Sequence, residues 1–194
     1  MGEVYAIVSG KGGTGKTSVC AGLACALAER EKKVLCIDCD VGLRNLDISL
    51  GMSDVPALSF LDVSEGSYRL EDAARHPKYP TWTDRFLLVT GPGPAAIRDA
   101  ARVSDLLELS GKKNVRLIVN RVDEEMLSTV RLTIDDVMDT TGTPLAGVVP
   151  EDPNITLSAA FGSPVPVYAK RCAAARAFRR IAARLEGIPT KIKL

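Results

Sequence analysis

Short apolar runs alternate with amphipathic stretches along most of the chain. Apolar runs of strand length lie at residues 4–9, 33–39, 86–90, 115–120 and 145–149, and helical periodicity at 17–31, 95–109, 130–139 and 169–185. In the first of these helices, Val19, Leu23, Ala26 and Leu27 share one face. Strands that alternate with helices favour a mainly parallel sheet with helices on both faces, so the pattern predicts an α/β fold.

The length of 194 residues suits one domain with a substantial core. The glycine- and proline-containing stretches at 91–94 and 162–166 are typical of loops between elements, not of linkers between domains. We therefore expect a single domain over residues 1–194.

Composition narrows the cellular setting and the partners. The net charge is +1, which provides no general attraction to nucleic acid or anionic lipid. The chain has no run of about 18 apolar residues that would span a membrane. The first residues enter a strand pattern without the basic start and apolar stretch of a signal peptide. We expect a cytoplasmic protein.

Five cysteines are an odd number, and disulfides are uncommon in a reducing compartment. Cys36 and Cys39 form a C-x-x-C pair, but positions three apart in the predicted strand point to opposite faces. We favour core packing for them, with a redox or metal role as the alternative. His76 is the only histidine, so a zinc site would depend on sulfur and carboxylate ligands.

A phosphate-binding loop lies between the first predicted strand and the first predicted helix. Residues 10–17 satisfy G-x-x-x-x-G-K-[ST], whose backbone N–H groups turn inward around phosphate oxygens at a helix N-terminus. Lys16 is expected to reach the β- and γ-phosphates, and the Thr17 hydroxyl to bind Mg²⁺. The predicted ATP-binding residues of this segment are Gly10, Lys11, Gly12, Gly13, Thr14, Gly15, Lys16, Thr17 and Ser18.

The same segment also satisfies the dinucleotide-binding pattern G-x-G-x-x-G through Gly10, Gly12 and Gly15. Asp38 follows at about the distance of a ribose-binding acid. A dinucleotide site has no use for adjacent Lys16 and Thr17 at the helix start, so we favour the phosphate loop of an ATP-binding protein.

Two acids follow the second predicted strand. Asp38 and Asp40 would lie at the carboxyl edge of the sheet, beside the phosphate loop. Acids in this position can hold Mg²⁺ through water or orient an attacking water. Solvated acids at a strand end are the alternative interpretation.

The early lysine in the loop makes residues 10–17 resemble the deviant Walker A box of the MinD and ParA family of P-loop ATPases. In that family the residue corresponding to Lys11 reaches the ATP of the partner subunit, which implies an ATP-dependent homodimer. Residues 41–47 resemble the MinD group more than the ParA group. The resemblance implies that Asp38 supports the metal, that Asp40 positions water and that Asn45 lies near the nucleotide.

Two later strand ends also resemble the MinD group, in which these loops hold the adenine. They contain Asn120 and Arg121 after one strand, and Pro150, Glu151 and Asp152 after another. An Asn side chain can donate to and accept from a purine edge, and a guanidinium can stack on the ring. By itself each segment is only a turn after a strand.

One family feature is missing from the sequence. The family has a further strand that ends in Asp and leads into a glycine-containing switch loop, but no such segment precedes the strand at 86–90. A strand, its switch loop and a helix are missing near Pro80–Asp84. Loss of an acid that supports Mg²⁺ predicts impaired hydrolysis.

The last predicted helix carries basic residues on one side and Cys172, Ala175, Phe178, Ile181 and Leu185 on the other. We expect a packing helix with a solvated basic side; a membrane or nucleic-acid patch is the alternative. Pro189 opposes a terminal amphipathic helix of the kind with which the MinD group binds membrane, so membrane binding is doubtful.

The resemblance implies a MinD-like ATP-binding switch that acts in division-site placement with a protein partner of that system. Its cofactors would be ATP and Mg²⁺. One alternative is a nucleotide-binding module that recruits a partner without hydrolysis. Another is a ParA-type partition ATPase, although the near-neutral charge makes nucleic acid an unlikely partner.

Overall fold

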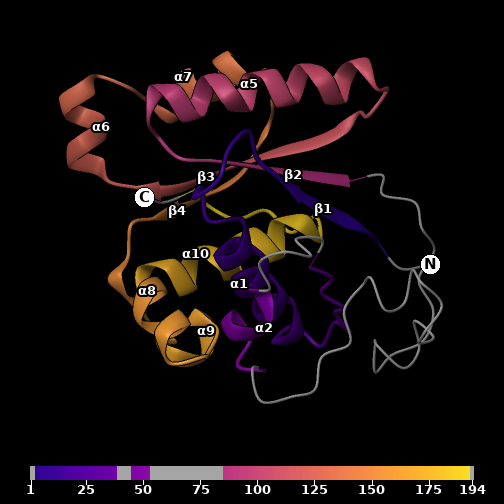
Figure 1. The fold of residues 1–194 in the computed structure, drawn as a ribbon, viewed down its shortest axis with the longest axis vertical. Helices are drawn as coiled ribbons and strands as arrows, with labels where there is room; N and C mark the ends of the chain where they lie inside the picture. The colour runs from indigo at the N-terminus through magenta and orange to yellow at the C-terminus, as the bar shows by residue number, and fades with distance from the viewer. Residues whose placement is uncertain (1–2, 39–44, 53–84, 193–194) are drawn as a thin grey trace.

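A computed structural model describes residues 3–38, 45–52 and 85–192 (Figure 1). At its centre is a parallel sheet of four strands in the order β1-β2-β3-β4. The strands are β1 (Tyr5–Val8), β2 (Arg85–Thr90), β3 (Asn114–Val122) and β4 (Leu145–Pro150). The predicted α/β fold with a parallel sheet is confirmed, and four of the five predicted strands are present.

Helices cover both faces of the sheet (Figure 1). One face is covered by α5 (Pro94–Leu109), α6 (Glu124–Val130) and α7 (Ile134–Thr141). The other is covered by α1 (Lys16–Ala28) and α10 (Ala173–Leu185), with the shorter α2 (Leu46–Ser49), α8 (Pro153–Ala160) and α9 (Val165–Tyr168) beside them. In the part of the chain that the structure describes, no helix is long and apolar enough to cross a membrane.

Side-chain alternation along the strands divides the core in two. Leu87 and Val89 of β2 pack with α1 and α10, whereas Leu88 between them packs with α5 and α7. Phe178 and Ile181 of α10 are fully buried in the first cluster, as the predicted packing face requires. Because adjacent residues of a strand point to opposite faces, strands buried on both sides are apolar throughout.

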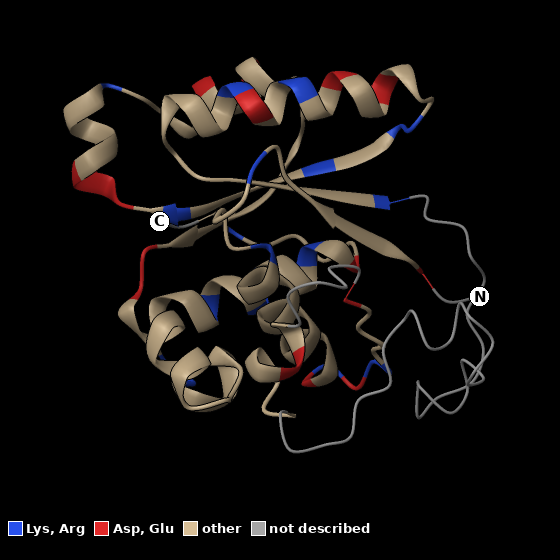
Figure 2. Cartoon of the chain, viewed as in Figure 1, with Lys and Arg blue, Asp and Glu red and all other residues tan. Residues whose placement is uncertain are grey.

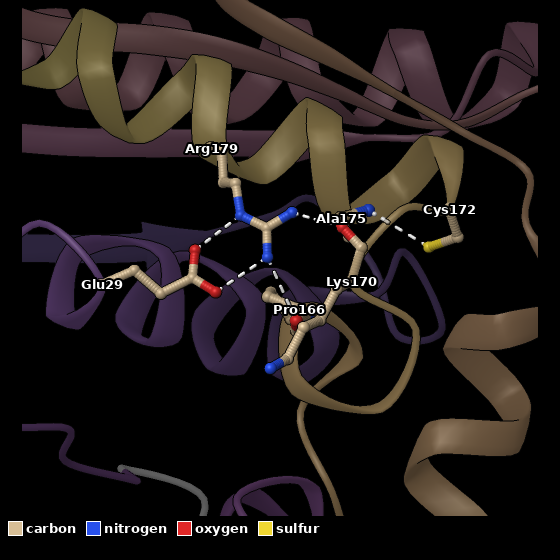
Figure 3. A network of polar contacts seen from close by, with 6 residues as sticks. All are labelled: Glu29, Pro166, Lys170, Cys172, Ala175 and Arg179. Atoms are coloured by element: carbon tan, nitrogen blue, oxygen red, sulfur yellow. Dashed lines mark hydrogen bonds and ion pairs between the residues drawn. The ribbon is translucent and has the colours of Figure 1, made fainter.

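An ion pair fixes α1 against α10 at the edge of this core (Figure 3). The Arg179 guanidinium donates from Nε to Glu29 Oε2 at 2.5 Å and from Nη2 to Glu29 Oε1 at 2.7 Å. It also donates to the backbone carbonyls of Pro166 and Lys170, which lie in and after α9. One side chain therefore ties three segments together, in the two-pronged geometry that suits Arg and carboxylate.

The strand predicted over 33–39 is wrong. Residues 32–38 form no strand, Cys39 lies outside the described residues, and Val34 and Ile37 are 41% and 51% exposed. A strand needs a hydrogen-bonded neighbour, and among the described residues β1 pairs with β2 alone. The segment has a strand-like sequence but no neighbour in register. The expectation that Cys36 and Cys39 point to opposite faces of a strand therefore has no basis.

Two predicted helices have different boundaries. The helix expected over 130–139 is replaced by α6 and α7, because Arg131 has a left-handed φ of 52° and a Thr133–Asp136 capping box begins α7. The helix expected from residue 169 begins instead at Ala173, where the Cys172 thiol accepts a hydrogen bond from the Ala175 N–H (Figure 3). Helices α2, α8 and α9 were not predicted.

Candidate functional site

The predicted phosphate loop connects β1 to α1 at the carboxyl edge of the sheet. Gly15 is the last residue before α1 and has a left-handed φ of 90°. A Cβ atom at Gly15 would lie 2.2 Å from Asn120 Nδ2, and one at Gly10 would lie 2.5 Å from the Asp99 backbone. The loop therefore needs glycine at both positions, because the chain passes too close to β3 and α5 for any side chain.

Lys16 folds back over the loop. Its ammonium group donates to Ser9 Oγ at 2.8 Å and to the Lys11 carbonyl at 3.4 Å. Ser9 Oγ donates in turn to the same carbonyl at 2.8 Å. The ammonium is thus held against the start of the loop by two oxygen acceptors. Ser9 was not identified from the sequence, because it precedes the motif.

Asn120 closes the loop from the end of β3. Its Nδ2 donates to the Thr14 carbonyl at 2.9 Å, and the side chain is only 2% exposed. Asn120 Oδ1 and Thr14 Oγ1 are buried atoms without a hydrogen-bond partner in the described part of the chain. Buried polar atoms are nearly always satisfied in folded proteins, so two unpaired oxygens beside one loop indicate a place for a hydrogen-bonding ligand.

An ion pair joins the two loops that were predicted to hold the base. Arg121 has a left-handed φ of 60° and donates from Nε to Glu151 Oε2 at 2.9 Å. The hydrogen bond to Glu151 raises the pKa of the Arg121 guanidinium above its usual value. Both side chains are about half exposed, so the pair contributes little to stability. It bridges the segments at the ends of β3 and β4.

A cavity of about 380 Å³ lies beside the loop, within the range of small-molecule sites, but Lys16 and Asn120 are not among its lining residues. Its lining includes the loop residues Lys11, Gly12, Gly13 and Thr14 with the Arg121–Glu151 pair. Six further lining residues were not predicted: Gly91, Pro92, Gly93, Ala96, Asp123 and Met126. The Gly-Pro-Gly sequence directly after a strand was the available signal, since ligands of α/β sheets bind at the carboxyl ends of strands.

Pro150 and Asp152 do not line this cavity. The Asp152 carboxylate is buried and accepts hydrogen bonds from the backbone N–H groups of Asn154 and Ala174, both at 3.0 Å. It therefore caps the start of α8 and reaches the start of α10. Burial opposes ionisation, but the hydrogen bonds from Ala174 and Asn154 lower the pKa of Asp152 below its usual value.

Asp38, the described acid of the predicted pair, contacts the start of α2. Asp38 Oδ2 accepts from the backbone N–H groups of Asn45 and Leu46 at 3.4 Å and 3.3 Å, so Asp38 and Asn45 are brought together. Asp40 lies outside the described residues, as do Pro80–Asp84. Thr17 and Ser18 lie in the first turn of α1 and are partly exposed. Within residues 3–38, 45–52 and 85–192, no three His, Cys, Asp or Glu side chains are grouped to hold a metal.

Comparison with known proteins gives a consistent result. A sequence model of the "CobQ/CobB/MinD/ParA nucleotide binding domain" family matches residues 5–165. The septum site-determining protein MinD of Synechocystis is 30% identical over 240 positions, which cover 96% of this chain and 90% of that protein. That alignment is longer than the 194 residues of this chain, so the Synechocystis protein has residues that are missing here.

Solved structures agree with the sequence comparison. MinD in the MinC:MinD cell division complex of Aquifex aeolicus superposes with a TM-score of 0.91 and 30% identity, over 100% of this chain and 99% of that one. MinD of Pyrococcus horikoshii, solved in complex with Mg-ADP, has a TM-score of 0.83 and 27% identity, with 96% of each chain covered.

Proposed function

Because the chain belongs to the CobQ/CobB/MinD/ParA nucleotide-binding family, and within it to the MinD proteins, we propose that it binds ATP with Mg²⁺ and acts as a switch in division-site placement. The main support for ATP binding is the Asn120 side chain. Its Nδ2 donates to the phosphate loop, while its buried Oδ1 has no partner in the described residues. An adenine amine is a donor that would satisfy this oxygen.

The residues around the loop fit a nucleoside triphosphate. The loop N–H groups and Lys16 would hold the phosphates, and the Thr17 hydroxyl and Asp38 would support Mg²⁺. The Arg121–Glu151 pair would border the base. When bound, the metal would supply charge neutralisation at the phosphates, and this chain's residues would orient the nucleotide.

The proposal includes an ATP-dependent homodimer. Lys11 is exposed at the mouth of the cavity, so its ammonium can extend away from its own loop toward a second copy. The Aquifex relative was solved with MinC, which supports a division protein as the downstream partner of this chain. We place the switch in the cytoplasm as part of the same proposal.

Nucleotide titration of the full chain tests the binding site. Lys16→Ala removes the ammonium that faces the loop, so Mg-ATP affinity should fall by roughly tenfold to a hundredfold. Lys113→Ala is the matched control, because Lys113 is an exposed lysine in the turn before β3, at the opposite edge of the sheet. Equal affinities for the two variants would contradict the proposed site.

Light scattering tests the dimer. Lys11→Ala should bind ATP nearly as well as the unaltered chain but should stay monomeric in its presence. An ATP-dependent doubling of mass in both proteins would rule out a trans role for Lys11. If neither protein doubles its mass, the chain binds nucleotide without self-association.

Two alternative functions predict different results in binding and hydrolysis assays. A module that recruits a partner without hydrolysis would bind ATP but release no phosphate in a steady-state assay. A ParA-type ATPase would bind DNA without sequence preference and with a steep salt dependence. Acidic and basic residues are interspersed along α5 (Figure 2). The net charge of +1 provides no general attraction to DNA, which argues against that alternative.

A further inference from the structure

The Ser9 hydroxyl contacts two residues of the phosphate loop from outside the motif. Ser9 directly follows β1, and its Oγ lies 2.8 Å from the Lys11 carbonyl oxygen and 2.8 Å from Lys16 Nζ. The Lys16 ammonium also donates to the same Lys11 carbonyl at 3.4 Å. The hydroxyl, the carbonyl and the ammonium therefore form a closed ring of hydrogen bonds at the start of the loop.

The chemistry of its partners fixes the orientation of the Ser9 hydroxyl. A carbonyl can only accept and an ammonium can only donate, so Ser9 Oγ must donate to Lys11 and accept from Lys16. Of the two bonds that the ammonium makes, the one to Ser9 is the shorter. Hydrogen bonds from an ionised donor are the stronger kind. Ser9 is therefore the main acceptor for the Lys16 side chain.

The Lys16 ammonium keeps one donor for a ligand. It carries three N–H donors, and the described part of the chain uses two of them. Both acceptors lie at the start of the loop, so the charge is held there whatever the third donor contacts. A phosphate oxygen that takes the third donor does not need to displace Ser9.

Both ends of this contact belong to fixed elements. Ser9 follows a strand that pairs with β2 from Tyr5 to Val8. Lys16 is the first residue of α1, whose Val19 is fully buried in the core. A lysine side chain loses much conformational entropy when it is ordered. A hydroxyl that orders it in advance lowers the entropy loss on ligand binding.

We propose that Ser9 is a positioning residue for phosphate binding, because its hydroxyl holds the Lys16 ammonium at the loop before a nucleotide binds. This inference rests on the proposed ATP site and adds to it a residue outside the phosphate-loop motif. Without the hydroxyl, Lys16 keeps only the 3.4 Å contact with Lys11, and the nucleotide has to order the side chain. The competing explanation is that Ser9 only shapes the loop through its bond to the Lys11 carbonyl.

A pair of variants of equal shape tests the hydroxyl in the full chain. Ser9→Val removes the hydroxyl and Ser9→Thr retains it. Mg-ATP affinity should fall by roughly threefold to tenfold in Ser9→Val and stay within about twofold in Ser9→Thr. Ser9→Ala, which adds no branched side chain, should match Ser9→Val and replaces it if that variant does not fold. Equal ATP affinities with and without the hydroxyl would overturn the proposal.

The same variants in a Lys16→Ala background separate positioning from loop shape. With no ammonium to hold, Ser9→Val and Ser9→Thr should bind ATP equally, because two residues that act through one contact have non-additive effects. A further loss of affinity in Ser9→Val alone would show that the hydroxyl acts on the loop and not through Lys16.

A measurement without nucleotide distinguishes failure of this inference from failure of the ATP site. Brief acylation by an N-hydroxysuccinimide ester, followed by peptide mass spectrometry, measures how readily each lysine reacts. Lys16 should react roughly twofold to tenfold faster in Ser9→Val than in Ser9→Thr, since its nitrogen must leave the hydroxyl to react. Exposed Lys113 is the internal control and should react equally in both. Equal Lys16 rates would overturn the role of Ser9, whereas an unaltered chain that binds no ATP would overturn the proposed function.

Discussion

The Asn120 side chain donates a hydrogen bond from Nδ2 to the Thr14 carbonyl at 2.9 Å, across 106 positions of sequence. This bond connects the end of β3 to the middle of the phosphate loop. It also fixes the amide, whose Oδ1 is buried next to the loop and has no partner in the described part of the chain. The structure therefore links the shape of the loop to the group that would recognise the base.

Replacing Asn120 tests both parts of this relationship. Asn120→Ala removes the bond to Thr14 and the free acceptor, so we expect loss of roughly 1–3 kcal/mol in unfolding free energy together with weaker ATP binding. Asn120→Asp keeps an acceptor but directs a carboxylate oxygen at the Thr14 carbonyl, so it should weaken binding as well. Denaturant unfolding and nucleotide titration measure the two effects. Unchanged ATP affinity in both variants would exclude Asn120 from the site.

Gly15→Ala should be much more harmful than an alanine at another glycine with positive φ. Gly15 has a φ of 90° and its added Cβ would lie 2.2 Å from Asn120 Nδ2. Gly111 has a φ of 73° with open space around it, so Gly111→Ala measures the backbone cost of about 1 kcal/mol alone. The clash should add roughly 1–3 kcal/mol at Gly15. Equal unfolding free energies for the two variants would mean that the loop relaxes freely.

Arg179→Ala should destabilise the fold more than Glu29→Gln does. Arg179→Ala removes the hydrogen bonds to Glu29 and to the carbonyls of Pro166 and Lys170 (Figure 3). Glu29→Gln alters only the contact with Arg179. Both side chains are about one-third exposed, so the ion pair itself is worth about 1 kcal/mol or less. We expect about 2 kcal/mol for Arg179→Ala from the additional lost contacts. Urea unfolding of both single variants and of the double variant measures the interaction free energy between Arg179 and Glu29.

Asp152 should make the fold sensitive to acid. Hydrogen bonds lower its pKa in the folded state against the opposing effect of burial. A depressed carboxyl pKa stabilises the fold above the unfolded pKa of about 4, and this contribution is lost as the pH falls through the lower folded value. Asp152→Asn should therefore be less stable at pH 7 by about 1 kcal/mol. The difference in unfolding free energy between this variant and the unaltered chain should shrink below about pH 4, as measured by urea unfolding at several pH values. A difference that stays constant with pH would show that the ionised Asp152 carboxylate is not its cause.

Hydrolysis should be slow even where ATP is bound. A segment that supplies an acid and a switch loop is missing by comparison with the family pattern, and the predicted position, Pro80–Asp84, lies outside the described residues. Loss of one charge-stabilising contact typically costs about 3–4 kcal/mol, or roughly a hundredfold to a thousandfold in rate. We expect phosphate release slower than that of an intact MinD by this factor, and little further change on Asp40→Ala. Equal turnover under the same conditions would show that another residue has taken over the role.

Features with a strong local signal were predictable from the sequence. The phosphate loop is a contiguous motif between a strand and a helix, and its glycines are required by the backbone conformation and close packing seen at Gly10 and Gly15. The buried strands and the packing faces of α1 and α10 follow from apolar periodicity. The position of Asn120 at a strand end placed it at the correct edge of the sheet, because parallel strands end together there.

Features that depend on distant neighbours were decided only by tertiary structure. Residues 33–38 have the composition of a strand, but strand formation requires a partner edge, and the described structure offers them none. The sequence likewise could not show that Arg121 pairs with Glu151, or that Asp152 caps α8 and also accepts from the Ala174 N–H at the start of α10. The sequence by itself determined the loop, the alternation of elements and the family. The contacts that complete the site were decided by the folded chain, because hydrogen bonds and ion pairs depend on distances between residues that only packing brings together.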